Sequence, residues 1–163
     1  SDAGALEVSL APLDLADSLS GRLEDAKGWI AEHGITLASD IQGPMMIRGD
    51  AQRLRQLWNN LIDNTLAYTT APGELRVQLK MKGQQACLSW EDSAPGVPAT
   101  ELERLTQRLY RVEGSRSRKS GGSGLGLSIA AALVSAHGGT LQASASSLGG
   151  LCWTIDFPLM PNA

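Results

Sequence analysis

The chain has 163 residues, enough for one domain with a substantial buried core and too few for two large ones. Its composition, 42% hydrophobic and 19% charged, excludes a disordered or fibrous protein. The net charge of −3 and the scarcity of aromatic residues (four Trp, two Tyr, one Phe) argue against a nucleic-acid partner. The longest apolar run, Ile129–Val134, is too short to span a bilayer, so we expect no direct membrane contact. Cys87 and Cys152 lack the spacing of metal ligands, and we expect reduced thiols in strands of a soluble domain.

The first half of the chain alternates short extended segments with two amphipathic helices. We interpret residues 1–6 as the remnant of a linker and residues 7–163 as one domain. The pattern predicts a strand over Glu7–Ala11 that ends at Pro12, a helix capped by Asp14 that ends at His33–Gly34, strands over Ile35–Ile41 and Met45–Arg48, and a helix capped by Asp50 that runs to about Tyr68.

The second half begins with a hairpin and ends with two strands. In chain order we expect strands over Leu75–Met81 and Ala86–Trp90 around a Gly83–Gln84 turn, a loop over Asp92–Pro98, a short helix near Glu101–Gln107, a long basic loop over Arg108–Gly122, a helix over Ser123–Ala136, and strands over Thr140–Ser146 and Leu151–Pro158. The fold class predicted from this order is an α/β two-layer sandwich, with a mixed, largely antiparallel sheet packed on about three helices.

A glycine-rich segment, Gly122–Leu127, lies where a loop is expected to become a helix. Small residues allow a ligand to approach the backbone, and the free N–H groups of a helix start favour phosphate. The spacing fits neither a dinucleotide-binding fingerprint, since Leu127 stands where a glycine is needed, nor a P-loop. The segment is therefore a phosphate cradle of another kind or a flexible entry to the helix.

Polar side chains also mark the helix that begins after Asp50. Gln56, Asn60 and Asn64 stand four residues apart and share one helix face. Asparagine is an indifferent helix former, and its carboxamide oxygen is a suitable ligand for Mg²⁺. The alternative is an ordinary hydrated face.

Two further features fit a nucleotide. Asp92 follows a predicted strand, where it either forms a turn or accepts a hydrogen bond from an exocyclic amine such as that of adenine. Basic residues gather in and before the long loop, and they suit a triphosphate or a solvated surface: Arg104, Arg108, Arg111, Arg116, Arg118 and Lys119.

Taken in order, these features resemble the motifs of sensor histidine kinases over nearly the whole chain, Leu6–Leu159. Asn60–Thr69 resembles their N box, Asp92–Gly96 their G1 box and Gly122–Leu127 their G2 box, while Leu105–Arg111 looks like a degraded F box. The run from Glu113 to Arg118, continued through the G2 box, is most similar to the envelope-stress sensor kinases. The resemblance implies an ATP-binding sandwich of the gyrase, Hsp90, histidine-kinase and MutL superfamily.

The resemblance also implies roles for individual residues. Asn64 would ligate Mg²⁺, Asn60 would bind near the phosphates, and Tyr68 would face the base. Asp92 would read the adenine amine, with Gly96 making room. Residues 108–122 would form a mobile ATP lid. The phosphate-binding and catalytic set would be completed by Arg111, by Arg116 or Arg118 at the γ-phosphate, and by Gly122, Ser123, Gly124, Leu125 and Gly126.

Several positions depart from the family pattern. Ala67 stands where a lysine or arginine is usual, Ala94 replaces the first glycine of the G1 box, and Thr106 and Leu109 replace phenylalanines of the F box. Cys152 lies where a small hydroxyl residue is common. By the family pattern, Ala67 removes one phosphate contact, Ala94 alters the turn, and the changes in the F box weaken the hydrophobic docking of the lid.

Asn60 stands where the ATPases of the superfamily carry a glutamate that activates water. An asparagine has no titratable group and cannot act as that base, which favours phosphoryl transfer over hydrolysis. His33 and His137 both precede glycines at expected helix ends, so we expect structural roles for them.

The function expected from the resemblance is that the chain binds Mg-ATP and passes the γ-phosphoryl to a histidine on a dimerisation segment outside it. That histidine would serve a response regulator. We expect a cytoplasmic domain whose parent protein lies in the bacterial inner membrane. The alternatives are a superfamily ATPase and a nucleotide-binding regulatory module without transfer.

Overall fold

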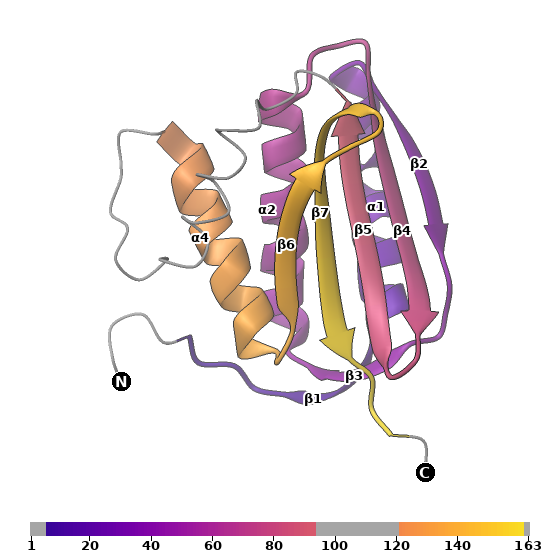
Figure 1. Cartoon of the computed structure of the whole chain (residues 1–163), viewed down its shortest axis with the longest axis vertical. Coiled ribbons are helices and arrows are strands. Elements are labelled where there is room, and N and C mark those ends of the chain that lie inside the picture. The colour runs from indigo at the N-terminus through magenta and orange to yellow at the C-terminus, as the bar shows by residue number, and fades with distance from the viewer. Residues whose placement is uncertain (1–5, 94–120, 162–163) are drawn as a thin grey trace.

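Three helices cover one face of a five-stranded sheet in the part of the chain that the computed structural model describes, residues 6–93 and 121–161 (Figure 1). The helices are α1 (Leu15–Glu32), α2 (Ala51–Tyr68) and α4 (Gly121–Ala136). The strands, in their order across the sheet, are β2 (Ile35–Ile41), β4 (Gly73–Lys82), β5 (Gln85–Ser93), β7 (Gly149–Pro158) and β6 (Thr140–Ala145). β2 runs parallel to β4, and the other neighbours are antiparallel. The predicted fold class is confirmed.

Aspartate caps begin the first two helices, as their positions in the sequence predict. Asp14 Oδ1 accepts hydrogen bonds from the backbone N–H groups of Ala16 and Met45, at 3.0 and 2.9 Å. Asp50 likewise accepts from Gln52 and Arg53, both at 3.1 Å. Each cap satisfies N–H groups that the helix itself leaves free.

The core lies between the helices and the inner face of the sheet. Its largest fully buried side chains include Trp58 of α2, Trp90 of β5 and Phe157 of β7. Burying one side chain of this size contributes about 1.5–3 kcal/mol. The alternation of buried and exposed residues along β4 and β5 keeps the opposite face polar.

The first strand differs from its prediction. It spans Ala11–Asp14 rather than Glu7–Ala11, and Pro12 lies inside it, opposite Arg48 of β3 (Met46–Gly49). β1 and β3 form a separate two-stranded ladder. Proline lacks an N–H, but an edge strand tolerates it because one side of such a strand needs no partner. The predicted short helix near Glu101–Gln107 lies outside the described residues.

Both histidines close helices, which confirms the structural roles expected for them. The Nδ1 atom of His33 lies 3.0 Å from the carbonyl oxygen of Trp29, and that of His137 lies 2.8 Å from the carbonyl oxygen of Leu133. His137 is buried, and its Nε2 accepts a hydrogen bond from the backbone N–H of Asp50 at 3.1 Å. Both of its ring nitrogens are therefore engaged, and they join the end of α4 to the start of α2.

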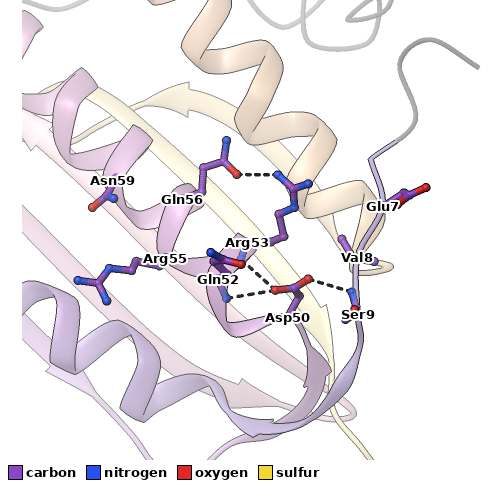
Figure 2. Close-up of a pocket in the computed structure, with 9 residues that line it drawn as sticks. All are labelled: Glu7, Val8, Ser9, Asp50, Gln52, Arg53, Arg55, Gln56 and Asn59. Atoms are coloured by element: carbon purple, nitrogen blue, oxygen red, sulfur yellow. Dashed lines mark hydrogen bonds between the residues drawn. The ribbon is translucent and has the colours of Figure 1, made fainter.

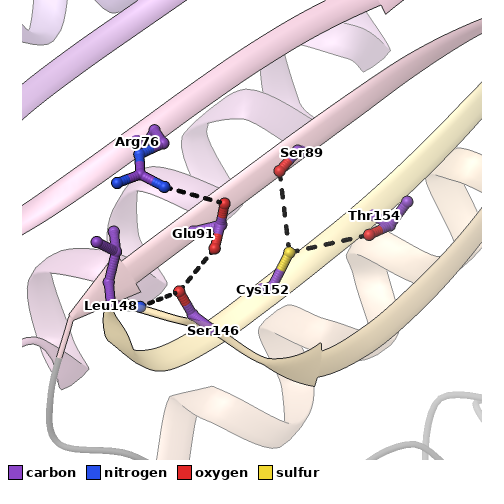
Figure 3. Close-up of polar contacts among 7 residues, drawn as sticks. All are labelled: Arg76, Ser89, Glu91, Ser146, Leu148, Cys152 and Thr154. Atoms are coloured by element: carbon purple, nitrogen blue, oxygen red, sulfur yellow. Dashed lines mark hydrogen bonds and ion pairs between the residues drawn. The ribbon is translucent and has the colours of Figure 1, made fainter.

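The open face of the sheet carries a polar network (Figure 3). Glu91 accepts a hydrogen bond from Ser146 Oγ at 2.7 Å, and its other oxygen lies 3.8 Å from Arg76 Nη1. Cys152 Sγ lies 3.9 Å from the hydroxyls of Ser89 and Thr154, on this face and away from the helices. Both cysteines are free and lie in strands, as predicted. Among the described residues, no helix has the length and apolarity needed to cross a membrane.

Candidate functional site

The candidate site centres on a buried carboxylate at the end of β5. Asp92 is 8% exposed; its Oδ1 accepts from the backbone N–H of Leu151 at 2.9 Å, and its Oδ2 lies 3.5 Å from Thr65 Oγ1. Burial raises the pKa of Asp92 above its usual value, and the hydrogen bonds from Leu151 and Thr65 oppose that shift. No ion pair joins it to a described cation. The carboxylate is thus held as a hydrogen-bond acceptor beside the last turns of α2.

Gly150 allows β7 to approach this carboxylate. A Cβ atom at this position would collide with the carbonyl oxygen of Ser93 and with the backbone and side-chain oxygens of Asp92. The β5–β7 register also shifts between Glu91 and Ser93. The last strand was predicted to begin at Leu151, but β7 begins at Gly149, so the predicted bounds left out the glycine that permits this close approach.

We predict that Gly150→Ala lowers the free energy of unfolding by about 1–3 kcal/mol, because the added methyl group has no space. The same change should weaken nucleotide binding, since it displaces the Leu151 N–H from Asp92. Denaturant unfolding and ligand titration measure the two effects. Gly28→Ala is the matched control: its Cβ meets open space within α1, so it should stabilise the chain by about 0.5–1 kcal/mol and leave binding unchanged. Equal stability and binding in Gly150→Ala and the parent chain would contradict the account.

Two asparagines of α2 stand in the turns around Thr65. Asn60 and Asn64 are half-buried, and the Nδ2 atom of each is buried without a hydrogen-bond partner among the described residues. Leaving a buried donor unpaired costs about 1–3 kcal/mol, so two such donors side by side point to a missing acceptor. Phosphate oxygens would accept from these amides. After a side-chain flip, each amide would instead present its oxygen to a cation.

Three other residues of α2 have surroundings different from those of the two asparagines. Gln56 was predicted to share the polar line, but its Oε1 accepts from Arg53 Nη1 at 3.1 Å. Tyr68 ends the helix with 49% of its surface exposed, and it is open to a flat ligand. Ala67 is exposed and offers no cation.

The glycine-rich segment lies in the first turns of α4, because the helix begins at Gly121 rather than at Ser123. The N–H groups of a helix's first turn have no partner within the helix. The backbone N–H groups of Gly122, Ser123 and Gly124 therefore lie in the first turn of α4, without partners inside the helix. This helix packs against α2. The side chains of residues 121–127, and all of Gly96, Arg111, Arg116 and Arg118, lie outside what the structure describes.

A surface pocket of about 770 Å³ opens at the other end of α2 (Figure 2). Its lining includes Asp50, Gln52, Arg53 and Ser9. The Asp50 carboxylate already accepts from the N–H groups of Gln52, Arg53 and Ser9, and these bonds lower its pKa, with Ser9 contributing most. The helix start is thus occupied by a negative charge, and the pocket does not suit a phosphate.

Residues 49–161 match the family described as "Histidine kinase-, DNA gyrase B-, and HSP90-like ATPase". The chain belongs to this family. The matched range contains α2, Asp92 and α4, which are the elements that form the candidate site.

Relatives within this ATPase family include sensor kinases. The chain is 41% identical over 159 residues to the signal transduction histidine-protein kinase BaeS of Escherichia coli, covering 98% of this chain and 34% of BaeS. It is 37% identical over 131 residues to the sensor histidine kinase RppB of Synechocystis, covering 80% of this chain and 29% of RppB. The chain thus spans about a third of the length of these relatives.

Solved structures of the same family share the fold. The mycobacterial sensor histidine kinase MprB matches with a TM-score of 0.74 and 26% identity, over 94% of this chain and all of that one. Full-length ShkA in complex with AMPPNP matches with a TM-score of 0.73 and 27% identity, over 98% of this chain and 33% of that one. The resemblance to histidine-kinase catalytic domains is confirmed, whereas the roles of individual residues stay predictions.

Proposed function

We propose that the chain binds Mg-ATP and passes the γ-phosphoryl to a histidine on a dimerisation segment outside these 163 residues. One observation carries the proposal: the buried acceptor Asp92 lies beside α2, where the buried Nδ2 donors of Asn60 and Asn64 have no partner within the described part of the chain. The Asp92 carboxylate can accept a hydrogen bond from an adenine amine, and the two asparagine amides can donate to phosphate oxygens. The structure of the relative ShkA in complex with AMPPNP supports a nucleotide as the ligand.

Each residue then has a distinct task. Asp92 accepts from the adenine amine, Tyr68 lies against the base, and Asn60 donates to phosphate. Among the described residues, no group of three His, Cys, Asp or Glu gathers to hold a metal. We therefore assign Mg²⁺ to the Asn64 amide oxygen together with the nucleotide's own phosphates. When bound, Mg²⁺ neutralises the charge that develops on the phosphates.

The asparagine at position 60 favours transfer of the γ-phosphoryl group over hydrolysis of ATP. The carboxamide of Asn60 does not accept a proton near neutral pH, so it cannot act as the base that activates a water molecule. The two alternatives differ in outcome: a superfamily ATPase would turn ATP over steadily, and a regulatory module would bind ATP without transfer. Ala67, which supplies no phosphate contact, is the observation that favours the second alternative.

The acceptor is placed outside the chain because both internal histidines have structural contacts at helix ends and both are followed by glycine instead of a carboxylate. The ring nitrogens of His137 are both hydrogen bonded, and Nδ1 of His33 faces the carbonyl oxygen of Trp29. By analogy with the sensor kinases, the phosphorylated segment would pass its phosphoryl to a response regulator, and the parent protein would lie in the inner membrane with this domain in the cytoplasm.

Incubation with γ-labelled ATP and a separately supplied dimerisation segment from a sensor histidine kinase tests the proposal. The chain alone should bind ATP, hydrolyse it very slowly and remain unlabelled. Added segment should acquire acid-labile phosphate at its histidine, slowly, because the two parts are not tethered. Label on His33 or His137, or steady release of inorganic phosphate, would contradict the proposal.

A further inference from the structure

A buried indole and a buried hydroxyl link β5 to α2 directly beneath the candidate site. Trp90 Nε1 donates a hydrogen bond to Thr65 Oγ1 at 2.9 Å. Trp90 is 0% exposed and Thr65 is 1% exposed. The Thr65 hydroxyl in turn lies 3.5 Å from Asp92 Oδ2.

The direction of this chain of hydrogen bonds follows from the chemistry of its members. An indole N–H can only donate, so the Thr65 oxygen must accept from it. The hydroxyl therefore has its own hydrogen available for Asp92, which as a carboxylate can only accept. With Leu151 N–H on Oδ1 and Thr65 on Oδ2, both oxygens of the carboxylate are anchored.

Folding alone gives little reason for this arrangement. A buried indole and hydroxyl can be exchanged for apolar groups of the same shape at nearly no cost in stability, whereas removing only one partner is costly. The hydroxyl is also dispensable for filling the core, because valine has nearly the shape of threonine. The polar atoms of Trp90 and Thr65 are explained if their hydrogen bonds fix the position of the Asp92 carboxylate.

We propose that Thr65 and Trp90 are positioning residues that fix the Asp92 carboxylate for adenine recognition, an inference that rests on the proposed function. Neither side chain touches the nucleotide. Trp90 directs the Thr65 hydroxyl, and Thr65 limits rotation of the carboxylate, so that its remaining acceptor positions face the base.

The molecule contains a matched pair that serves as a control. Trp58 Nε1 donates to Ser18 Oγ at 2.9 Å, and Trp58 is also 0% exposed and also lies on α2. This second pair joins α2 to α1 instead of to Asp92. Breaking it should cost comparable stability without affecting the choice of base.

The experiment compares the dissociation constants of Mg-ATP and of inosine triphosphate, which has a carbonyl in place of the adenine amine. Thr65→Val should lower the preference for ATP by about 2- to 12-fold, the effect of losing one hydrogen bond of ordinary strength, because the Thr65–Asp92 contact is long and Leu151 still holds the other oxygen. Thr65→Ser keeps the hydroxyl and should restore the parental ratio. Trp58→Phe should leave the ratio at the parental value.

The double variant Thr65→Val with Trp90→Phe separates positioning from stability. It removes both polar partners, so no buried indole N–H is left without an acceptor, and its ATP preference should stay low even though the smaller ring adds a separate cavity cost. In the parent chain, ATP should also shift the indole N–H resonance that is lost in Trp90→Phe, although the ring lies beneath the site.

Two outcomes are distinguishable. A parental ATP preference in Thr65→Val, or in the double variant if Thr65→Val does not fold, would overturn the positioning roles and leave the proposed function intact. Failure of the parent chain to bind ATP would overturn the proposed function itself.

Discussion

Replacing Asn64 by alanine is expected to weaken Mg-ATP binding by about 10- to 150-fold, the range for losing one contact to a charged group. Its Nδ2 atom is buried without a hydrogen-bond partner among the described residues, which indicates that a ligand completes the contacts of this side chain. If the amide oxygen ligates Mg²⁺, binding of ATP measured in chelator should change much less than binding of Mg-ATP. Calorimetric titration under the two conditions gives both values.

Gln56→Ala is the matched control for Asn64→Ala. It removes an amide from the same helix two turns earlier, where Arg53 already engages it. Binding should be unchanged in this variant. Equal affinities of Asn64→Ala and the parent for Mg-ATP would remove Asn64 from the site.

Asp92→Ala should abolish the preference for ATP over inosine triphosphate. In the parent chain, the carboxylate accepts from the adenine amine, and a carbonyl at that position of the base would leave two acceptors facing each other. Truncation leaves neither base with a partner, so a preference of about 10- to 150-fold should fall toward unity. A parent chain that binds both nucleotides equally would refute the role given to Asp92.

Adenine recognition should also depend on pH through the same carboxylate. Burial raises the pKa of Asp92 above the ordinary 3.8, so the acceptor is lost at a higher pH than an exposed aspartate would require. ATP affinity of the parent should therefore fall as the pH is lowered through that raised pKa, and Asp92→Ala should lack this step. A carboxyl whose pKa is higher in the folded chain than in the unfolded chain makes the folded chain more stable as the pH falls. Titration of Asp92 therefore does not unfold the chain, and unfolding at this group would not explain the loss of ATP affinity.

Much of the fold follows from local sequence signals. Three predicted features have a short-range physical cause, and the structure confirms them: the helix caps Asp14 and Asp50, the glycine after His33, and the alternation of β4 and β5. The first strand was predicted wrongly because Pro12 is a breaker only where both sides of a strand need partners. That condition depends on the ladder with β3, which is a long-range contact.

The candidate site shows the same division. Asp92 and the two asparagines could be proposed as candidates from residue type, spacing and the order of the motifs, since none of these depends on the fold. Leu151, Gly150 and Thr65 could not, because their contacts with Asp92 arise from strand register and helix packing. The adjacent glycines at positions 149 and 150, which begin β7, were the sequence signal of that close approach.

The most direct test of the central claim is a calorimetric titration of the chain with ATP in the presence of Mg²⁺, repeated with Asp92→Ala. The account predicts one binding site per chain, stronger with Mg²⁺ than without it, and much weaker binding by the variant. Absence of binding by the parent chain, or equal binding by Asp92→Ala, would contradict it.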